Sequence, residues 1–174
     1  MNYVLKLFST GAVRQTPERI IKRITEEVDS SKRNFVELGS GKGEITASII
    51  KKLPRNAKIN YYAFEIEESF NTDLKEQFPK INVINESAFS FNDKIPSDIK
   101  IDYFLCSMPL SFYSNEEIQS LLESKKNRLS NGGKIIILFH AAWLKKLLKS
   151  CLPGAESYSY LSFPPYFLII YTDS

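Results

Sequence analysis

The stretch Glu37–Glu44 carries three alternating glycines, Gly39, Gly41 and Gly43, between an apolar run and a segment with helical spacing. Glycine lets the backbone turn with positive φ and lets a ligand approach without meeting a Cβ. A strand, a tight loop and a helix in this order build the mononucleotide sites of open α/β sheets. The pattern therefore predicts a ligand-binding loop that includes Ser40, with an ordinary glycine-rich turn as the alternative.

The side chains of this loop help to choose among three classes of ligand. The phosphate-loop consensus G-x-x-x-x-G-K-[ST] fails because Val36 stands at its first glycine and Gly43 follows Lys42. A dinucleotide fingerprint needs a glycine where this chain has Glu44. Glu37 and Glu44 would also repel a pyrophosphate. A cofactor that carries an ammonium and a sulfonium instead suits two carboxylates.

Acidic and small residues follow the next two predicted strands. Glu65 ends the strand 59–65 about 20 residues after the glycines, where an acid can accept hydrogen bonds from both hydroxyls of a ribose. We expect Ile66 at the same site, and an exposed strand-end carboxylate is the alternative for Glu65. After the third strand, Ser87 and Ala88 form the corresponding loop.

A loop that contains a proline follows the fourth predicted strand, Ile101–Cys106. In an open α/β sheet the ligand crevice lies outside the carboxyl ends of the strands, so this loop should face the reacting part of a ligand. Proline rigidifies the backbone and removes a donor, which leaves neighbouring carbonyl groups free to accept hydrogen bonds. A plain strand-to-helix loop is the alternative. The candidate residues here are Ser107, Met108, Pro109, Leu110 and Tyr113.

The elements that must position these residues alternate between strand and helix patterns, as in a parallel sheet with helices on both faces. Thr16-Pro17-Glu18 predicts the capped start of a first helix, and Ser114–Glu117 is a capping box. Asn131-Gly132-Gly133 is expected to end the helix that follows, and Asn92–Lys100 to be a loop. Strands are predicted over 34–38, 59–65, 81–85, 101–106, 134–139, 158–163 and 166–172, and further helices over 44–53, 69–78 and 141–150.

Composition bounds the class of protein. A chain of 174 residues with 43% hydrophobic and 25% charged residues is expected to form one globular domain, with residues 1–33 as an N-terminal arm and covering helix. The net charge of +3 is too mild to indicate nucleic acid or an acidic membrane. The apolar stretch 135–144 is far shorter than the roughly 20 residues that span a bilayer, and no signal peptide is visible. Two cysteines without metal spacing fit a reducing cytoplasm, so we expect a cytoplasmic protein without a metal site.

The arrangement E-x-G-x-G-x-G from Glu37 to Gly43 resembles the first motif of class I S-adenosylmethionine-dependent methyltransferases. The resemblance implies an α/β, Rossmann-like fold: a seven-stranded, mostly parallel sheet, helices on both faces and a C-terminal antiparallel hairpin. It also implies S-adenosyl-L-methionine as the cofactor, with the glycines beneath it, Glu37 near its amino group and Glu65 on its ribose. Ser87 and Ala88 would read the adenine edge, with Ser87 standing where the family usually has an acid.

Three further segments resemble the bacterial phospholipid N-methyltransferases, which are relatives of the rRNA adenine dimethyltransferases. These segments are Gly11-Ala12-Val13 before Thr16, Ser107-Met108-Pro109-Leu110, and Ser162-Phe163-Pro164-Pro165. The ribosomal enzymes carry an Asn-Leu-Pro-aromatic motif that grips the adenine amino group, whereas this chain has Ser107 and Leu110 at those places. The departure favours the lipid relative.

This narrower resemblance implies methylation of an amine such as that of phosphatidylethanolamine, which would meet the methyl group at Ser107 to Leu110. Tyr113 is a candidate for aromatic contact with the cationic head group, with packing as the alternative. His140 is a candidate proton acceptor, with a hydrogen-bonded strand-end histidine as the alternative.

A lipid substrate requires membrane contact. Either the N-terminal arm or the amphipathic segment 143–149 could supply it, although that segment's pattern equally describes a helix packed on the sheet. We therefore expect a cytoplasmic enzyme that is peripheral on the inner membrane face. The alternatives are a methyltransferase of the same fold that acts on RNA, protein or a small molecule, and a noncatalytic binding module. The absence of a strong basic patch counts against RNA.

Overall fold

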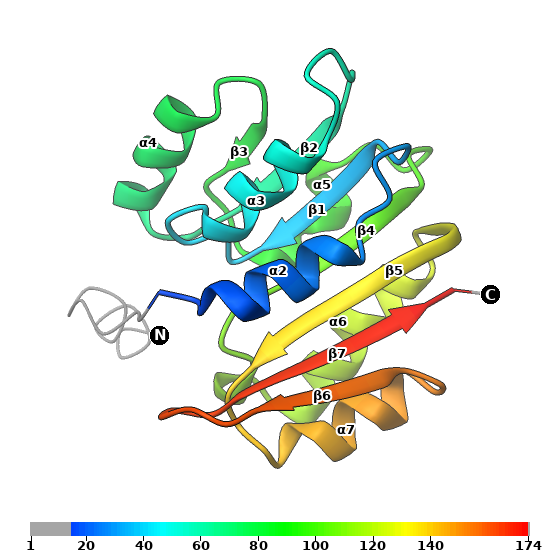
Figure 1. The fold of residues 1–174 in the computed structure, drawn as a ribbon. Helices are drawn as coiled ribbons and strands as arrows, with labels where there is room; N and C mark the ends of the chain where they lie inside the picture. Colours follow the sequence, from blue (N-terminus) through cyan, green and yellow to red (C-terminus); the bar gives the residue numbers. More distant parts are fainter. Residues whose placement is uncertain (1–14, 174) are drawn as a thin grey trace.

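A computed structural model describes residues 15–173, which form a seven-stranded sheet in the order β3-β2-β1-β4-β5-β7-β6 (Figure 1). The first five strands of the chain are parallel to one another, and β7 runs antiparallel between β5 and β6. This confirms the predicted α/β methyltransferase fold and its C-terminal hairpin. The strands are β1 (Asn34–Leu38), β2 (Asn60–Phe64), β3 (Asn82–Ile84), β4 (Ile101–Cys106), β5 (Leu129–Phe139), β6 (Glu156–Tyr160) and β7 (Tyr166–Thr172).

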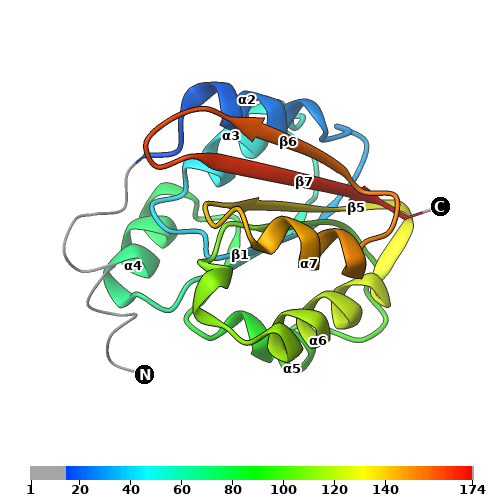
Figure 2. The ribbon, with the colours of Figure 1, turned by 90° about the horizontal axis from the view of Figure 1, so that it is seen from below.

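Helices cover both faces of the sheet (Figure 2). On one face, α2 and α3 pack Ile20, Ile24 and Ile49 against Phe35 of β1. On the other face, α5, α6 and α7 contribute a second apolar cluster. Because both faces are covered, the central strand β4 is buried at every residue. The helices are α2 (Glu18–Glu26), α3 (Glu44–Lys52), α4 (Glu68–Gln77), α5 (Phe91–Lys94), α6 (Asn115–Lys126) and α7 (Leu144–Cys151).

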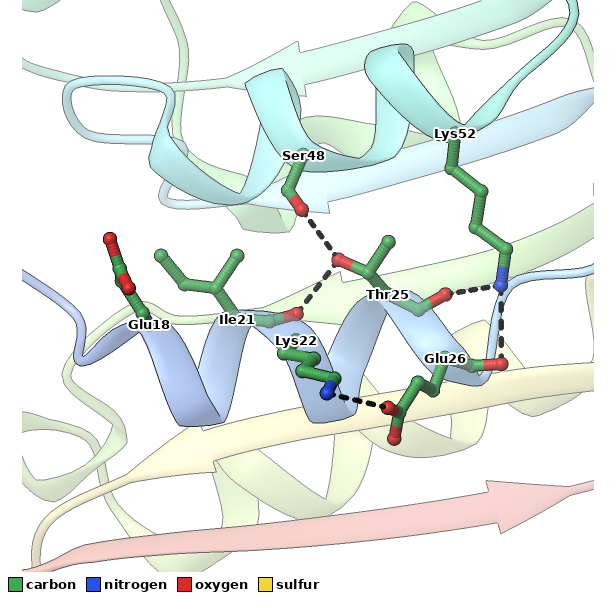
Figure 3. A pocket seen from close by; sticks show the side chains of 7 residues that line it. All are labelled: Glu18, Ile21, Lys22, Thr25, Glu26, Ser48 and Lys52. Atoms are coloured by element: carbon green, nitrogen blue, oxygen red, sulfur yellow. Dashed lines mark hydrogen bonds and ion pairs between the residues drawn. The ribbon is translucent and has the colours of Figure 1, made fainter.

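Polar contacts join α2 to α3 on the outer surface (Figure 3). The Lys52 ammonium donates to the carbonyls of Thr25 and Glu26, at 2.6 and 3.3 Å, where α2 ends. A cation suits the last turn of a helix because the carbonyls there have no partner within the helix. The Thr25 and Ser48 hydroxyls lie 2.8 Å apart. The shallow hollow between these helices is therefore part of the contact between α2 and α3, and most of its polar groups form hydrogen bonds with one another.

The first helix does not begin as the sequence predicts. Pro17 occupies the N-cap position and the helix starts at Glu18, without a side-chain cap. The backbone N–H of Thr16 instead donates to the Glu44 carboxylate at 2.8 Å. Thr16 thus ties the chain to the start of α3, a long-range contact that local cap statistics cannot reveal.

The predicted role of Asn131-Gly132-Gly133 is also wrong. The preceding helix ends at Lys126, and β5 already begins at Leu129. The two glycines lie inside β5, where its register against β4 shifts between Ile101 and Tyr103. Gly132 has a φ of 69°, and glycine within a strand is typical of such an irregularity.

Two smaller differences concern helices. The predicted loop 92–100 begins inside α5, whose first residue, Phe91, is fully buried and packs edge-on against Phe104. The helix predicted over 141–150 begins three residues later, at Leu144, and ends at Cys151. Residues 1–14 of the predicted N-terminal arm lie outside the described residues, and the predicted covering helix is α2.

Candidate active site

A cavity of about 420 Å³ lies at the edge of the sheet where β1, β2, β4 and β5 end and β7 begins. This is the edge at which open α/β sheets bind their ligands. Most of the predicted site residues line it: Gly39, Ser40, Gly41, Glu65, Ile66, Ser87, Ala88, Ser107, Met108, Pro109, Leu110 and Tyr113. Glu37 and Gly43 do not line it.

The glycine loop lets two strand ends approach closely. A Cβ on Gly39 would lie 3.0 Å from the backbone N and Cα of Met108, and Gly39 has a φ of 79°. The Ser107 hydroxyl donates to the Gly39 carbonyl at 2.7 Å. The loops after β1 and β4 are thus held together as one wall of the cavity. A Cβ on Gly43 would instead meet the Leu74 side chain at 2.7 Å, so Gly43 serves the packing of α4.

Glu65, directly after β2, contacts the glycine loop from the neighbouring strand. One carboxylate oxygen accepts the N–H of Gly41 at 2.8 Å. The other accepts the N–H groups of Ile66 and Glu67 at 2.8 and 3.0 Å. Because a carboxylate has about four acceptor positions, Glu65 can hold the loop and still accept a hydrogen bond from a ligand hydroxyl.

Glu37 lies on the inner side of β1, among buried side chains. Its Oε2 accepts hydrogen bonds from the Thr46 and Tyr61 hydroxyls, both at 2.5 Å. Its Oε1 is buried and has no hydrogen-bond partner among residues 15–173. Burial raises the pKa of Glu37 to about 7, and the negative charge of Glu65 adds to the rise, while the two hydroxyl hydrogen bonds oppose it. In this geometry Glu37 positions the start of α3 and does not face the cavity, so its predicted contact with a ligand stays a prediction.

The loop after β4 combines buried and exposed side chains. Met108 and Leu110 are buried, whereas Phe112 is half exposed at the mouth of the cavity. The Tyr113 ring packs on Phe89, with centroids 5.1 Å apart, and not only beside Phe112 as its place in the sequence suggests. Burial raises the pKa of Tyr113, so its hydroxyl stays protonated at neutral pH.

Sequence reasoning missed several residues that complete the cavity. Pro164 and Tyr166 reach it from the hairpin because Phe167 of β7 pairs with Phe139 of β5. The sequence singled out Pro164 as part of a family-like segment but did not place either residue at the site, since only strand pairing brings them there. Thr16, Lys42, Glu44, Ile45, Phe64, Phe70, Glu86, Ser111, Phe112, Leu138, Phe139, Ala141 and Leu144 also line the cavity.

Groups of His, Cys, Asp and Glu that could hold a metal ion are absent from residues 15–173. Within that range, the helices are also too short or too polar to cross a membrane.

Comparison with known proteins places the chain in a family. Residues 13–148 match the family described as "Histidine-specific methyltransferase, SAM-dependent". A curated relative, ribosomal RNA small subunit methyltransferase A of Pelagibacter ubique, is 28% identical over 86 residues. That match spans 49% of this chain and only 31% of the relative.

Solved methyltransferases share the fold. The N-methyltransferase NodS of Bradyrhizobium japonicum, in complex with S-adenosyl-L-homocysteine, superposes with a TM-score of 0.74 at 10% identity, over 98% of this chain and 96% of that one. An rRNA methylase of Streptococcus thermophilus gives a TM-score of 0.67 at 16% identity, over 94% of this chain and all of that one. At such identities the likeness shows the fold alone.

The residues of the cavity fit S-adenosylmethionine. Ser40 is 6% exposed and lines the cavity, and its hydroxyl is buried without a hydrogen-bond partner among the described residues, so the hydroxyl is available to a polar group of a ligand. A Cβ on Gly41 would meet nothing within 4 Å, which leaves space above the loop. Glu65 offers acceptors for hydroxyls, and Ile66, Phe70 and Ala88 offer an apolar slot for a flat base.

The match to a family of enzymes favours catalysis over a noncatalytic binding module, and it confirms the broader of the two resemblances in the sequence. The chain therefore belongs to the family described as "Histidine-specific methyltransferase, SAM-dependent", and it is a class I methyltransferase that uses S-adenosylmethionine as its cofactor.

Proposed function

We propose that this enzyme methylates the amino nitrogen of a phospholipid head group such as phosphatidylethanolamine. The observation that carries the proposal is a set of exposed apolar side chains, the apolar rim, at the edge of the sheet where the cavity lies. The rim consists of the large apolar side chains that are exposed in residues 15–173: Ile66, Phe89, Phe112, Trp143, Leu161 and Phe163.

All six rim residues lie at the same edge of the sheet. Four of them follow the carboxyl ends of β2, β3, β4 and β5, and two lie in the connection between β6 and β7, which reaches the same edge. Leu161 is 92% exposed and Trp143 is 56% exposed. Two of the six, Ile66 and Phe112, also line the cavity. Exposed apolar side chains gathered at one edge of a protein mark a surface that meets an apolar partner, and a lipid surface is such a partner.

Helix α7 adds positive charge beside the rim. Leu144 and Leu148 are buried, so the apolar stripe of this helix packs inward. Of the two alternatives for segment 143–149, the stripe therefore follows the one of a helix packed on the sheet. Trp143 and the side chains of Lys146 and Lys149 remain exposed. Lysines near a membrane surface attract anionic lipids, which supports a peripheral position on the inner membrane face.

The chain's own residues would act mainly by positioning, because methyl transfer to an amine is an in-line displacement. When bound, the cofactor supplies a methyl group on a sulfonium centre. Gly39, Ser40 and Glu65 would hold it at the β1 and β2 ends of the cavity. The loop from Ser107 to Leu110 would receive the amine, and the aromatic ring of Tyr113 would contact the cationic head group.

Two other substrates deserve a direct comparison in the assay. The curated relative named above is a ribosomal RNA enzyme, which makes RNA a second candidate. The family description names histidine, whose amino group is also an amine. The six rim side chains themselves supply no charged partner to a phosphate backbone or to a small zwitterion, so they favour the lipid. The lysines of α7 and the charged residues of the cavity are the reason to test RNA and histidine beside it.

The experiment supplies radiolabelled S-adenosylmethionine together with phosphatidylethanolamine vesicles, RNA or free histidine, each in a separate reaction. We expect label in the lipid fraction, with little in the other two. Vesicles of phosphatidylcholine, whose nitrogen already carries three methyl groups, are the matched control. Label that enters RNA or histidine and never the lipid would overturn the proposal.

A further inference from the structure

His140 stands directly after β5, next to the strand whose loop would receive the amine, and it lines the cavity. Its ring is held from two sides. Nδ1 lies 2.8 Å from the carbonyl oxygen of Pro165, and the ring stands edge-on to Tyr166, with centroids 4.3 Å apart and planes at 61°. The hairpin therefore fixes the orientation of the imidazole.

The contact with Pro165 decides which ring nitrogen carries the proton. A carbonyl oxygen can only accept a hydrogen bond, so Nδ1 must be the donor. In the neutral ring the other nitrogen, Nε2, then has no proton and offers a lone pair. The strand-end hydrogen bond is thus compatible with a role in chemistry, because it uses one nitrogen and leaves the other basic.

A primary amine is mostly protonated at neutral pH, since its pKa is about 10. An ammonium has no lone pair and cannot attack a methyl group. We propose that Nε2 of His140 accepts the proton that the substrate ammonium must lose. The N–H bond of the substrate breaks, its electron pair stays on the substrate nitrogen, and the proton forms a new bond to Nε2. His140 is exposed, so the proton can then pass to water.

The other ionisable groups that line the cavity are less suited to this role: Lys42, Glu44, Glu65, Glu86, Tyr113 and Tyr166. Three are carboxylates that already accept contacts. Glu44 accepts the Thr16 N–H, Glu65 accepts three backbone N–H groups, and Glu86 pairs with Lys94 at 2.7 Å.

A lysine ammonium such as that of Lys42 donates hydrogen bonds and accepts none, and burial raises the pKa of the Tyr113 phenol, so this phenol does not take up a proton.

The strand order also favours His140. Gly39, Gly41 and Glu65 come from the ends of β1 and β2, whereas His140 comes from β5, with the loop after β4 between them. In an in-line displacement the nucleophile and the leaving group lie on opposite sides of the transferred carbon. With the cofactor over the β1 side, the amine belongs on the β5 side, where His140 stands.

The first test reads the ring directly. His140 is the single histidine of the chain, so nitrogen NMR of the labelled, unliganded enzyme gives one imidazole spin system. We expect the neutral ring to carry its proton on Nδ1. A proton on Nε2 would overturn the proposal, whatever the enzyme methylates.

The second test is the pH dependence of kcat/KM for His140→Asn, with Glu123→Gln on the exposed surface of α6 as the control. Asparagine can still donate to the Pro165 carbonyl but cannot take up a proton. We expect a loss of about 100-fold or more at neutral pH, which shrinks as the pH approaches the pKa of the amine itself, and unchanged binding of S-adenosylhomocysteine. The control should follow the wild type.

The outcomes of these tests separate the role of His140 from the lipid proposal. The role of His140 rests on the proposed function only in that the substrate is an amine. If the wild type labels lipid but His140→Asn keeps its full rate at neutral pH, the role of His140 is refuted and the lipid proposal stands. If the wild type labels histidine and not lipid, the lipid proposal fails, and the same pH series is run with histidine as the amine. A loss that is equal at every pH would indicate a structural role and would refute proton transfer.

Discussion

Replacing Glu37 by Gln removes a buried carboxyl group that lies between the hydroxyls of Thr46 and Tyr61. Burial raises the pKa of this group in the folded protein from 4.5 to about 7. Because the folded-state pKa lies above the unfolded one, the stability that this group contributes is fully present below about pH 4.5 and is lost as the pH rises through about 7.

The size of the effect follows from the rise in the pKa of Glu37. At about 1.4 kcal/mol per pH unit, the rise corresponds to about 3 kcal/mol of unfolding free energy. Glutamine stays neutral and keeps an oxygen that can accept from both hydroxyls. We therefore expect the stability of Glu37→Gln, relative to the wild type, to increase by about 3 kcal/mol between about pH 4 and about pH 8.

The assay is urea-induced unfolding of both proteins across that pH range, with Glu123→Gln as the surface control. The informative quantity is the change with pH of the difference in unfolding free energy between the variant and the wild type. The size of that difference at any one pH also includes a constant contribution from the amide donor that Gln places near the unpaired oxygen position. A difference that stays flat, or that moves toward the wild type as the pH rises, would refute the reasoning. It would mean that Glu37 is ionised in the folded protein and faces a cation or donor that this geometry does not include.

Three further changes test the site. Gly39→Ala places a Cβ 3.0 Å from the Met108 backbone at a φ of 79°. We expect this substitution to lower the free energy of unfolding by about 1 to 3 kcal/mol and to weaken S-adenosylhomocysteine binding in calorimetry. Unchanged stability would contradict the close approach of the two loops. Glu65→Gln removes the carboxylate whose oxygens accept three backbone N–H groups. Because hydrogen bonds to a charged group contribute about 1.5 to 3 kcal/mol each, we expect at least a tenfold loss of affinity for S-adenosylhomocysteine. An unchanged affinity would argue against this cofactor site. The double change Leu161→Ser and Trp143→Ser should lower binding to vesicles by about tenfold or more, because burying each side chain in lipid contributes about 1.5 kcal/mol or more. Binding of S-adenosylhomocysteine should stay as in the wild type. If the variant and the wild type sediment equally with vesicles, the rim is not a membrane surface.

Much of the fold could be predicted because its signals are local. The strands Asn34–Leu38 and Ile101–Cys106 occur as the apolar runs indicate, and Ser114 caps α6 in the predicted capping box. The glycines after β1 have the positive φ that their spacing suggested. Each of these features depends on residues close together in the sequence, so the backbone preference and the tertiary structure agree.

The errors occur where a distant partner overrides a local preference. Thr16 has the chemistry of an N-cap, but its N–H finds the Glu44 carboxylate. Gly132 and Gly133 have the chemistry of a helix terminator, but pairing with β4 draws them into β5. In both cases a contact across the fold outweighs a preference of about 1 kcal/mol.

The amino-acid sequence by itself determined the order of strands and helices along the chain, the glycine loop and the acid that follows β2, because these follow from periodicity and from residues next to one another. Glu37 and Phe35 share one face of β1, since side chains alternate along a strand. Only the tertiary structure decided that this face is covered by α2 and α3, so that Glu37 is enclosed with Thr46 and Tyr61 while Glu65 lines the cavity. The pairing of β7 with β5 likewise brought Pro165 to the ring of His140, because hydrogen bonding between strands joins residues that the chain itself keeps far apart.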